Sequence, residues 1–259
     1  MRRILVIGIG AGDPRHLTLE AVEAIASVDV FFVIDKGTAP ELLALRELVL
    51  RRHAAEGHRV VVIPDADRDR DPGDYDAAVR DWHRERAARI GAAIADELAD
   101  DGVGAFLVWG DPSLYDSTLR VLDRVRSAGI VDLEHAVIPG ISAVQALAAA
   151  HRVALHGIGE PVLVTTGRRL AATFGPDTPN AVVMLDGQLA FTEVDPEGVE
   201  VLWGAYLGTP DEVLVAGDLA EVADRIVEVR AEARDRLGWI MDIYLLRRTP
   251  VGASGERPG

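Results

Sequence analysis

The chain contains no cysteine among its 259 residues. This absence excludes disulfide bridges, cysteine-ligated zinc, iron–sulfur clusters and thiolate nucleophiles. Covalent catalysis would have to use oxygen or nitrogen groups, and we predict no metal site.

Positive charge is also scarce. Lys36 is the only lysine, and 27 Lys and Arg residues face 42 Asp and Glu residues, which gives a formal net charge of -15. A nucleic-acid-binding surface needs a basic face to neutralise phosphates, so we expect no nucleic-acid partner. A substrate with many carboxylates would be repelled at long range, and it would need a local cluster of arginines.

Long hydrophobic runs are missing as well. The first apolar run, residues 4–7, ends at a glycine, and no other apolar stretch is much longer. Such runs are too short for a signal peptide or a membrane span. We therefore expect a soluble, cytoplasmic protein that does not act at a membrane.

The first half of the chain alternates between short apolar runs and amphipathic stretches, which is typical of a parallel α/β sheet. The predicted strands are residues 4–7, 30–34, 60–63, 103–108 and 133–138. The predicted helices are residues 19–27, 40–53, 75–98 and 117–127.

The second half has strands with fewer helices between them, which favours an α+β domain with a mixed sheet. Its predicted strands are residues 162–166, 181–185, 199–205, 213–216 and 239–246. A proline and a glycine at 139 and 140 mark the junction, because they end one strand before a new helix. We therefore predict an N-terminal α/β domain at 1–138, a C-terminal α+β domain at 139–248 and a disordered tail at 249–259.

Glycines follow the first predicted strand, in a glycine loop that covers residues 8–14. A strand that runs into glycines indicates close approach of backbone to a ligand, although a plain turn would look similar. A dinucleotide-binding turn is the rival interpretation, because Asp35 ends the second strand where a ribose-binding acid belongs. That interpretation would make the chain an NAD-dependent oxidoreductase.

Two details of the glycine loop count against a dinucleotide. Asp13 stands where the dinucleotide fingerprint has a glycine, and the next helix is predicted to begin only after Thr18, a suitable N-cap. The loop thus carries a carboxylate and lacks the helix N-terminus that would meet a pyrophosphate. An anionic ligand is disfavoured, whereas a ligand with a positive centre, such as a sulfonium with an amino group, is tolerated.

Two further loops follow predicted strands of the same sheet. The Gly-Asp-Pro loop, residues 109–113, follows the strand 103–108, and the Pro-Gly segment, residues 139–143, follows the strand 133–138. Ligands of open α/β sheets bind at this carboxyl edge. Taken singly, each loop also fits a turn or a helix cap.

These three loops, in this order, resemble those of the tetrapyrrole methylase family, and the resemblance covers essentially the whole chain before the tail. It implies two α/β domains with S-adenosylmethionine in the cleft between them, S-adenosylhomocysteine as product, and a homodimer. Many relatives have proline where this chain has Ala11. The cofactor-binding positions that the resemblance implies are Gly10, Ala11, Trp109, Gly110, Asp111, Ser142, Ala143, Met184, Ala205 and Tyr206.

Several other stretches resemble the family members that methylate precorrin-5 at C1 and release its acetyl group as acetate. These stretches are residues 31–37, 109–118, 159–161, 165–169, 203–210 and 238–242. The implied partner is a small tetrapyrrole with many carboxylates, for which the substrate-binding candidates are Arg168, Arg169, Lys36 and Tyr115. Another precorrin C-methyltransferase, a methylase of protein or RNA and a non-catalytic cofactor sensor remain alternatives.

A general base for the deacylation must come from the cleft loops, where the candidates are Asp13, His16, Asp111 and Tyr115. We predict Asp13, because Asp111 is better placed to shape the cofactor loop and a tyrosine would need a strongly lowered pKa. A turn-forming carboxylate bonded to local N–H groups is the alternative role for Asp13.

Overall fold

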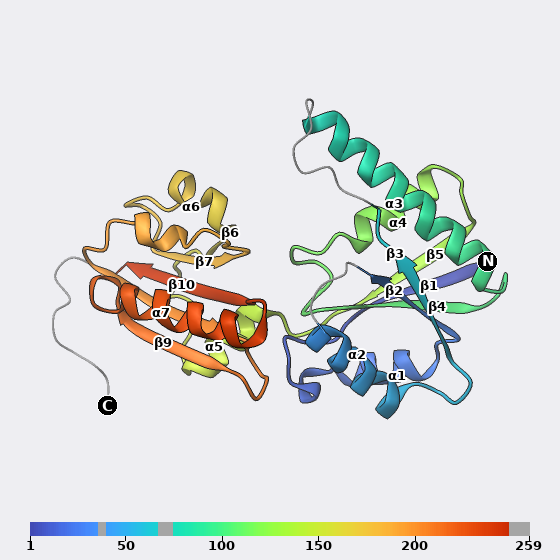
Figure 1. Ribbon diagram of the computed structural model, residues 1–259, viewed down its shortest axis with the longest axis horizontal. Coiled ribbons are helices and arrows are strands. Elements are labelled where there is room, and N and C mark those ends of the chain that lie inside the picture. The colour runs from blue at the N-terminus through green and yellow to red at the C-terminus, as the bar shows by residue number, and fades with distance from the viewer. Residues whose placement is uncertain (36–39, 67–74, 249–259) are drawn as a thin grey trace. The chain divides into compact units, whose positions relative to one another are not determined.

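The computed structural model describes residues 1–35, 40–66 and 75–248, with the backbone alone for 40–44 and 75–80. The predicted tail at 249–259 lies outside the described residues. The chain divides into two compact units, Met1–Ser142 and Ala143–Gly259, whereas the sequence placed the boundary after residue 138. Each unit has its own sheet and its own core (Figure 1).

The first unit contains a five-stranded sheet in the order β3-β2-β4-β1-β5, and all its strand pairs are parallel. The strands are β1 (Arg2–Gly8), β2 (Val30–Asp35), β3 (Arg59–Pro64), β4 (Val103–Val108) and β5 (Leu133–Ile138). Parallel neighbours require crossover connections, which here contain helices. These are η1 (Pro14–His16), α1 (Leu19–Ala26), α2 (Pro40–His53), α3 (Tyr75–Glu97) and α4 (Thr118–Ser127).

Helices cover both faces of this sheet (Figure 1). Neighbouring residues of a strand point to opposite faces, so Phe31 joins the core that contains Ile25 of α1, and Phe32 joins the core that contains Ile90 of α3. Burial on both faces explains why the strands appear in the sequence as continuous apolar runs.

The second unit contains a five-stranded mixed sheet in the order β6-β7-β10-β8-β9. Its strands are β6 (Leu163–Thr166), β7 (Asn180–Met184), β8 (Val199–Ala205), β9 (Val213–Asp218) and β10 (Asp242–Arg248). The helices are α5 (Ala143–His151), α6 (Gly167–Thr173), η2 (Ala190–Glu193) and α7 (Leu219–Leu237). The predicted fold class, a parallel α/β sheet followed by an α+β part with a mixed sheet, is confirmed.

The last strand begins later than the sequence predicts. It was expected at 239–246, but β10 starts at Asp242 because α7 continues to Leu237 and ends in the left-handed cap Gly238, with φ of 74°. Trp239 then packs against the core of the second unit rather than pairing in the sheet. The apolar character of this stretch therefore reflects core packing and not strand pairing.

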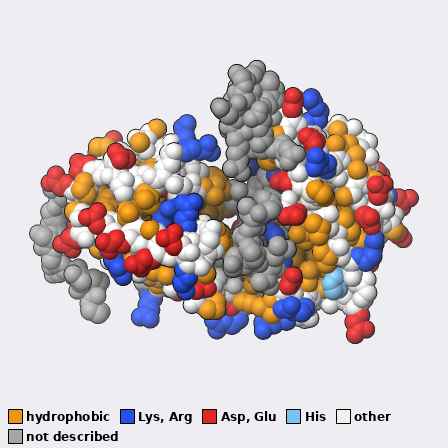
Figure 2. Space-filling view, viewed as in Figure 1, with side chains coloured by type: hydrophobic (Ala, Val, Ile, Leu, Met, Phe, Trp, Pro, Cys, Tyr) orange, Lys and Arg blue, Asp and Glu red, His pale blue; other side chains and the backbone are white. Residues whose placement is uncertain are grey.

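Charged side chains of both signs are interspersed on the face of the molecule that Figure 2 shows. Among the described residues, no helix is long and apolar enough to cross a membrane.

Candidate functional site

The three predicted loops leave neighbouring strands, because β4, β1 and β5 are adjacent in the first sheet. The glycine loop and the Gly-Asp-Pro loop are joined directly by backbone hydrogen bonds. The N–H of Gly110 donates to the carbonyl of Gly10 at 2.8 Å, and the N–H of Gly10 donates to the carbonyl of Gly110 at 3.3 Å. The loops thus form one continuous structure at the carboxyl edge of the sheet.

Gly8 and Gly140 make this edge possible, because neither has a side chain where the backbones meet. A Cβ at Gly8 would lie 2.6 Å from the nitrogen of Gly140 and 2.7 Å from the carbonyl oxygen of Gly110. A Cβ at Gly140 would lie 2.2 Å from that same oxygen. These distances are far inside van der Waals contact, so glycine is required at both positions.

Asp111 connects the Gly-Asp-Pro loop to the Pro-Gly segment. Its Oδ2 accepts a hydrogen bond from the N–H of Gly140 at 2.9 Å, and its Oδ1 accepts one from the N–H of Ser113 at 2.8 Å. Partial burial opposes ionisation, but the hydrogen bonds from Ser113 and Gly140 outweigh it and hold the pKa of Asp111 below its ordinary value. Asp111 therefore acts as an ionised brace within the loops.

Gly10 and Ala11 are both buried within the glycine loop. Gly10 has a φ of 82°, and a Cβ there would lie 2.6 Å from the Cβ of His16. The side chain of Ala11 is 2% exposed, so the position that is proline in many relatives faces the interior of this unit.

Asp13 forms the turn that the alternative interpretation described. Its Oδ1 accepts from the N–H of Arg15 at 2.8 Å, and its Oδ2 pairs with Nη2 of Arg15 at 2.6 Å. The hydrogen bond from the Arg15 side chain lowers the pKa of Asp13 to about 2. A general base works best with a pKa near the operating pH, so this environment does not favour the predicted base role.

The glycine loop does not lead into a helix N-terminus. The short turn η1 intervenes, and α1 begins after Thr18, whose Oγ1 accepts from the N–H of Ala21 at 3.0 Å. The predicted N-cap is thereby confirmed. A dinucleotide pyrophosphate would find no helix N-terminus here, which removes the basis of the NAD alternative.

The remaining candidates of the first unit differ in their surroundings. Trp109 packs against the core beneath the loops, and its indole N–H has no hydrogen-bond partner within the described part of the chain. Tyr115 is 42% exposed and has a φ of 54°. Ser142 is buried at 4% exposure, and Lys36 lies outside the described residues.

In the second unit, Met184 and Ala205 come to one edge of the sheet. Met184 pairs with Ile243 of β10, and Ala205 pairs with Asp242 of the same strand. β6, β7 and β8 run in one direction, so their carboxyl ends share this edge. Ala143 is the first residue of α5.

The segments that follow β7 and β8 contain non-glycine residues in left-handed conformations. Leu185 has a φ of 54° with a side chain 65% exposed, and Tyr206 has a φ of 51° with a side chain 3% exposed. The hydroxyl of Tyr206 donates to the carbonyl of Trp239. Strained backbone of this kind gathers at ligand-binding positions.

Arg168 and Arg169 lie in the first turn of α6, which begins at Gly167 directly after β6, and both side chains are exposed. They therefore lie at the same edge of the second sheet as the end of β7. A pair of guanidinium groups in this position suits carboxylate ligands.

The sequence interpretation missed a buried network behind this edge, which we call the Asp186 network. It consists of Asp186, Trp203, Arg230, Asp242 and Tyr244. The sequence alone does not distinguish a buried arginine of a helix from an exposed one, so Arg230 could not be recognised as a member of the network. The available signals were the stretches 203–210 and 238–242, which contain the network members Trp203 and Asp242.

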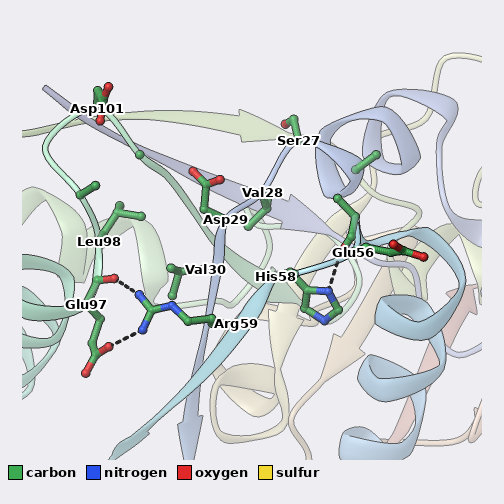
Figure 3. Close-up of a pocket in the computed structure, with 15 residues that line it drawn as sticks. Ser27, Val28, Asp29, Val30, Glu56, His58, Arg59, Glu97, Leu98 and Asp101 are labelled. Atoms are coloured by element: carbon green, nitrogen blue, oxygen red, sulfur yellow. Dashed lines mark hydrogen bonds and ion pairs between the residues drawn. The ribbon is translucent and has the colours of Figure 1, made fainter.

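A cavity of about 560 Å³ lies at the opposite edge of the first sheet, at the amino ends of β2, β3 and β4. Figure 3 shows Asp29, Glu56 and Asp101 around it, with Arg59 paired to Glu97 at 2.8 Å. None of the predicted site residues lines this cavity, so it is separate from the candidate site.

The carboxyl edge of the first sheet, with its three loops at 8–14, 109–113 and 139–143, is called the glycine edge below. Its groups fit S-adenosylmethionine better than an anion. Gly110 presents backbone without a side chain, and Asp111 carries an ionised carboxylate. Glycine backbone admits a ligand closely, and a carboxylate favours sulfonium and amino groups over an anion.

Known proteins resemble this chain along nearly its whole length. The model of the family Tetrapyrrole (Corrin/Porphyrin) Methylases matches residues 3–223. The precorrin-6A synthase (deacetylating) of Sinorhizobium sp is 48% identical over 250 residues, which cover 96% of each chain. The crystal structure of a cobalamin synthesis related protein, CobF, from Corynebacterium diphtheriae is 42% identical, with a TM-score of 0.85 over 96% of this chain and 99% of that one.

A more distant structure shares only the fold. The uroporphyrin-III C-methyl transferase of Thermus thermophilus, solved in complex with S-adenyl homocysteine, is 22% identical with a TM-score of 0.57. The match covers 95% of this chain and 97% of that one.

Proposed function

The chain belongs to the tetrapyrrole (corrin/porphyrin) methylase family, and we propose that it methylates precorrin-5 at C1 and releases the acetyl group as acetate to give precorrin-6A. The observation that carries this proposal is the 48% identity to a precorrin-6A synthase (deacetylating), because it extends over 96% of the chain. The chain is thus a methyltransferase of cobalamin biosynthesis. The proposed step, formation of precorrin-6A with loss of the acetyl group, is taken from the name of this relative.

The proposed cofactor is S-adenosylmethionine, which members of the family use and which supplies the methyl group when bound. The backbones of Gly10 and Gly110 would receive it in the first unit. In the second unit, Met184 and Tyr206 are the proposed contacts, at the ends of β7 and β8. Asp111 would hold the Gly-Asp-Pro loop in shape without transferring a proton.

The proposed substrate carries many carboxylates, and the chain carries a formal net charge of -15. Local cations must therefore overcome long-range repulsion. Arg168 and Arg169 are exposed at one edge of the second sheet, and we assign them to bind substrate carboxylates. Lys36 and Tyr115 are the further proposed substrate contacts.

In the proposed reaction, water adds to the acetyl carbonyl and the bond between that carbon and C1 breaks. Acetate leaves with one oxygen from water, and the two protons of that water are released to solvent. The electron pair left on C1 forms the new bond to the methyl carbon, whose bond to the sulfonium sulfur breaks, so that S-adenosylhomocysteine would leave. C1 becomes nucleophilic only after the acyl group has gone, so the two events are coupled.

Mass spectrometry of the products from precorrin-5 and S-adenosylmethionine tests the proposal. We expect acetate and S-adenosylhomocysteine in equal amounts, with one labelled oxygen in the acetate when the solvent is ¹⁸O-water. Methylation without acetate would identify another precorrin C-methyltransferase, and unlabelled acetate would exclude attack by water. Cofactor binding without any methyl transfer would identify a sensor.

The proposal extends to assembly and location. A homodimer in the cytoplasm is expected from the family resemblance. Light scattering of the purified chain and fractionation of cells that express it would test the two expectations separately.

A further inference from the structure

The Asp186 network lies behind the edge of the second sheet that contains Met184 and Tyr206. Asp242 accepts from Nε of Arg230 at 2.8 Å and from the indole N–H of Trp203 at 3.1 Å. Nη2 of Arg230 donates to the backbone carbonyl of Asp186 at 3.0 Å. The network thus joins α7, β8 and β10 to the segment that follows β7.

The network is almost completely shielded from water. Asp186 is 6% exposed, Arg230 is 7% exposed and Tyr244 is 1% exposed. The Tyr244 hydroxyl donates to Oδ2 of Asp186 at 2.7 Å. Buried polar groups are costly when they lack partners, so a network with its groups paired fixes one arrangement of the elements that it joins.

Asp186 also fixes the backbone of the loop that follows β7. Its side chain accepts from the N–H of Gln188 at 3.1 Å and from the N–H of Ala190 at 2.7 Å. Within this loop, Leu185 and Leu189 have φ values of 54° and 59°. Left-handed leucines persist only where the surroundings over-determine the backbone, and Asp186 and Arg230 supply that constraint.

The same carboxylate sets the start of α6. A Cβ at Gly167 would lie 2.3 Å from Oδ1 of Asp186, so the carboxylate occupies the space of the missing side chain. Arg168 and Arg169 follow directly. Asp186 therefore contacts both the loop after β7 and the first turn that carries the two arginines.

We propose that the Asp186 network is the positioning device of the cofactor-binding edge of the second unit, with Asp186, Arg230, Asp242 and Tyr244 as positioning residues. They act through the backbone of residues 184–190 and hold it ready to receive the ligand. Pre-organisation of this kind raises affinity, because the ordering of the loop occurs on folding and not on binding. This inference rests on the proposed function.

The test is Tyr244→Phe, which removes one hydroxyl donor and keeps the ring that packs edge-on against Phe191 at 5.3 Å. The probe is S-adenosylhomocysteine, with its Kd measured by calorimetry. We expect the Kd to rise about fivefold or more. Amide hydrogen exchange of residues 185–190 should speed up in the free variant, and added S-adenosylhomocysteine should restore protection.

Asn180→Leu is the matched control at the opposite end of β7. Asn180 is fully buried and donates to Oε2 of Glu160 at 3.0 Å and to the carbonyl of Pro161 at 3.1 Å. This variant should lower the Tm while the Kd and the exchange of residues 185–190 stay unchanged. Trp203→Phe, which removes a donor to Asp242, should behave like Tyr244→Phe and serves if that variant is poorly folded.

The possible results distinguish a failure of the proposed function from a failure of the role of the Asp186 network alone. If the unaltered chain binds no S-adenosylhomocysteine, the proposed function fails and this inference fails with it. If the unaltered chain binds but Tyr244→Phe leaves its Kd unchanged, or if Asn180→Leu raises the Kd as much, the network is only structural and this inference alone is overturned.

Discussion

The backbone N–H of Gly140 donates to Oδ2 of Asp111 at 2.9 Å, so a side chain of one loop fixes the backbone of the next. The carbonyl of Gly110 lies against the same glycine, at a distance that leaves no room for a Cβ. A change at Gly140 should therefore reach the whole glycine edge.

Gly140→Ala should disrupt this edge, because its Cβ would lie 2.2 Å from the carbonyl oxygen of Gly110. Overpacking of this kind costs about 1–3 kcal/mol in the free energy of unfolding. Displacement of the Gly-Asp-Pro loop should also weaken S-adenosylmethionine binding by about tenfold or more. Thermal melts and calorimetry measure the two effects.

Gly175→Ala is the control for this substitution, since a Cβ at Gly175 meets nothing within 4 Å. It should leave both stability and affinity unchanged. Unaltered cofactor affinity in a folded Gly140→Ala variant would remove the Pro-Gly segment from the binding site.

Asp13→Asn should change how stability depends on pH. The pKa of Asp13 is lowered from 3.8 to about 2 in the folded chain, so its ionised form stabilises the fold above its ordinary pKa and that contribution is lost as pH falls toward 2. The difference in free energy of unfolding between the parent and Asp13→Asn should therefore be largest above pH 4 and should close near pH 2. Urea titrations across this range measure it.

The same Asp13→Asn variant should keep at least about a tenth of the methyltransfer rate, because a carboxylate occupied by Arg15 with so low a pKa is a poor proton acceptor. Acetate release at saturating substrate is the measurement. A loss of about a thousandfold in a variant that still binds the cofactor would restore the base role.

The double variant Arg168→Ala with Arg169→Ala should raise the KM for the substrate by about tenfold or more, since a hydrogen bond to a charged group contributes roughly 1.5–3 kcal/mol. The Kd for S-adenosylhomocysteine should stay the same. Arg124→Ala with Arg126→Ala on α4 removes two other exposed arginines and should leave the KM unchanged. An unaltered KM in the first variant would return these arginines to a solvent-facing role.

Arg230→Met should destabilise the second unit by about 3–5 kcal/mol at neutral pH, because it leaves the carboxylate of Asp242 buried without its cationic partner. Burial raises the pKa of Asp242, and Arg230 opposes that rise. Without Arg230, the pKa of Asp242 in the folded chain should rise further. The protonated carboxyl then stabilises the folded state at low pH, and this stabilisation is lost as the pH rises through the folded-state pKa. The destabilisation should thus be smaller near pH 4 than near pH 7. An equal loss at both pH values would mean that Asp242 does not titrate in the variant.

Local patterns in the sequence were sufficient for the strands of both units, apart from the start of β10, and for the α-helices of the first unit. Continuous apolar runs predicted strands buried on both faces, and Thr18 marked the start of α1 because its hydroxyl satisfies a free N–H of the first turn. The three loops could also be found, since glycine after a strand and Asp-Pro pairs are local signals. The late start of β10 escaped prediction, because Trp239 is apolar for a reason that only packing explains.

The sequence by itself determined the fold class, the family and the absence of thiol chemistry, because composition, periodicity and loop motifs all lie within short stretches of chain. Only the tertiary structure decided which groups are paired. In the structure, Asp13 pairs with Arg15 and Asp111 accepts a hydrogen bond from Gly140. Arg230 donates a hydrogen bond to the carbonyl of Asp186, which lies 44 residues away in the sequence. Pairings of this last kind depend on how distant elements pack, and burial then turns an ordinary arginine or aspartate into a fixed partner, which no local pattern can record.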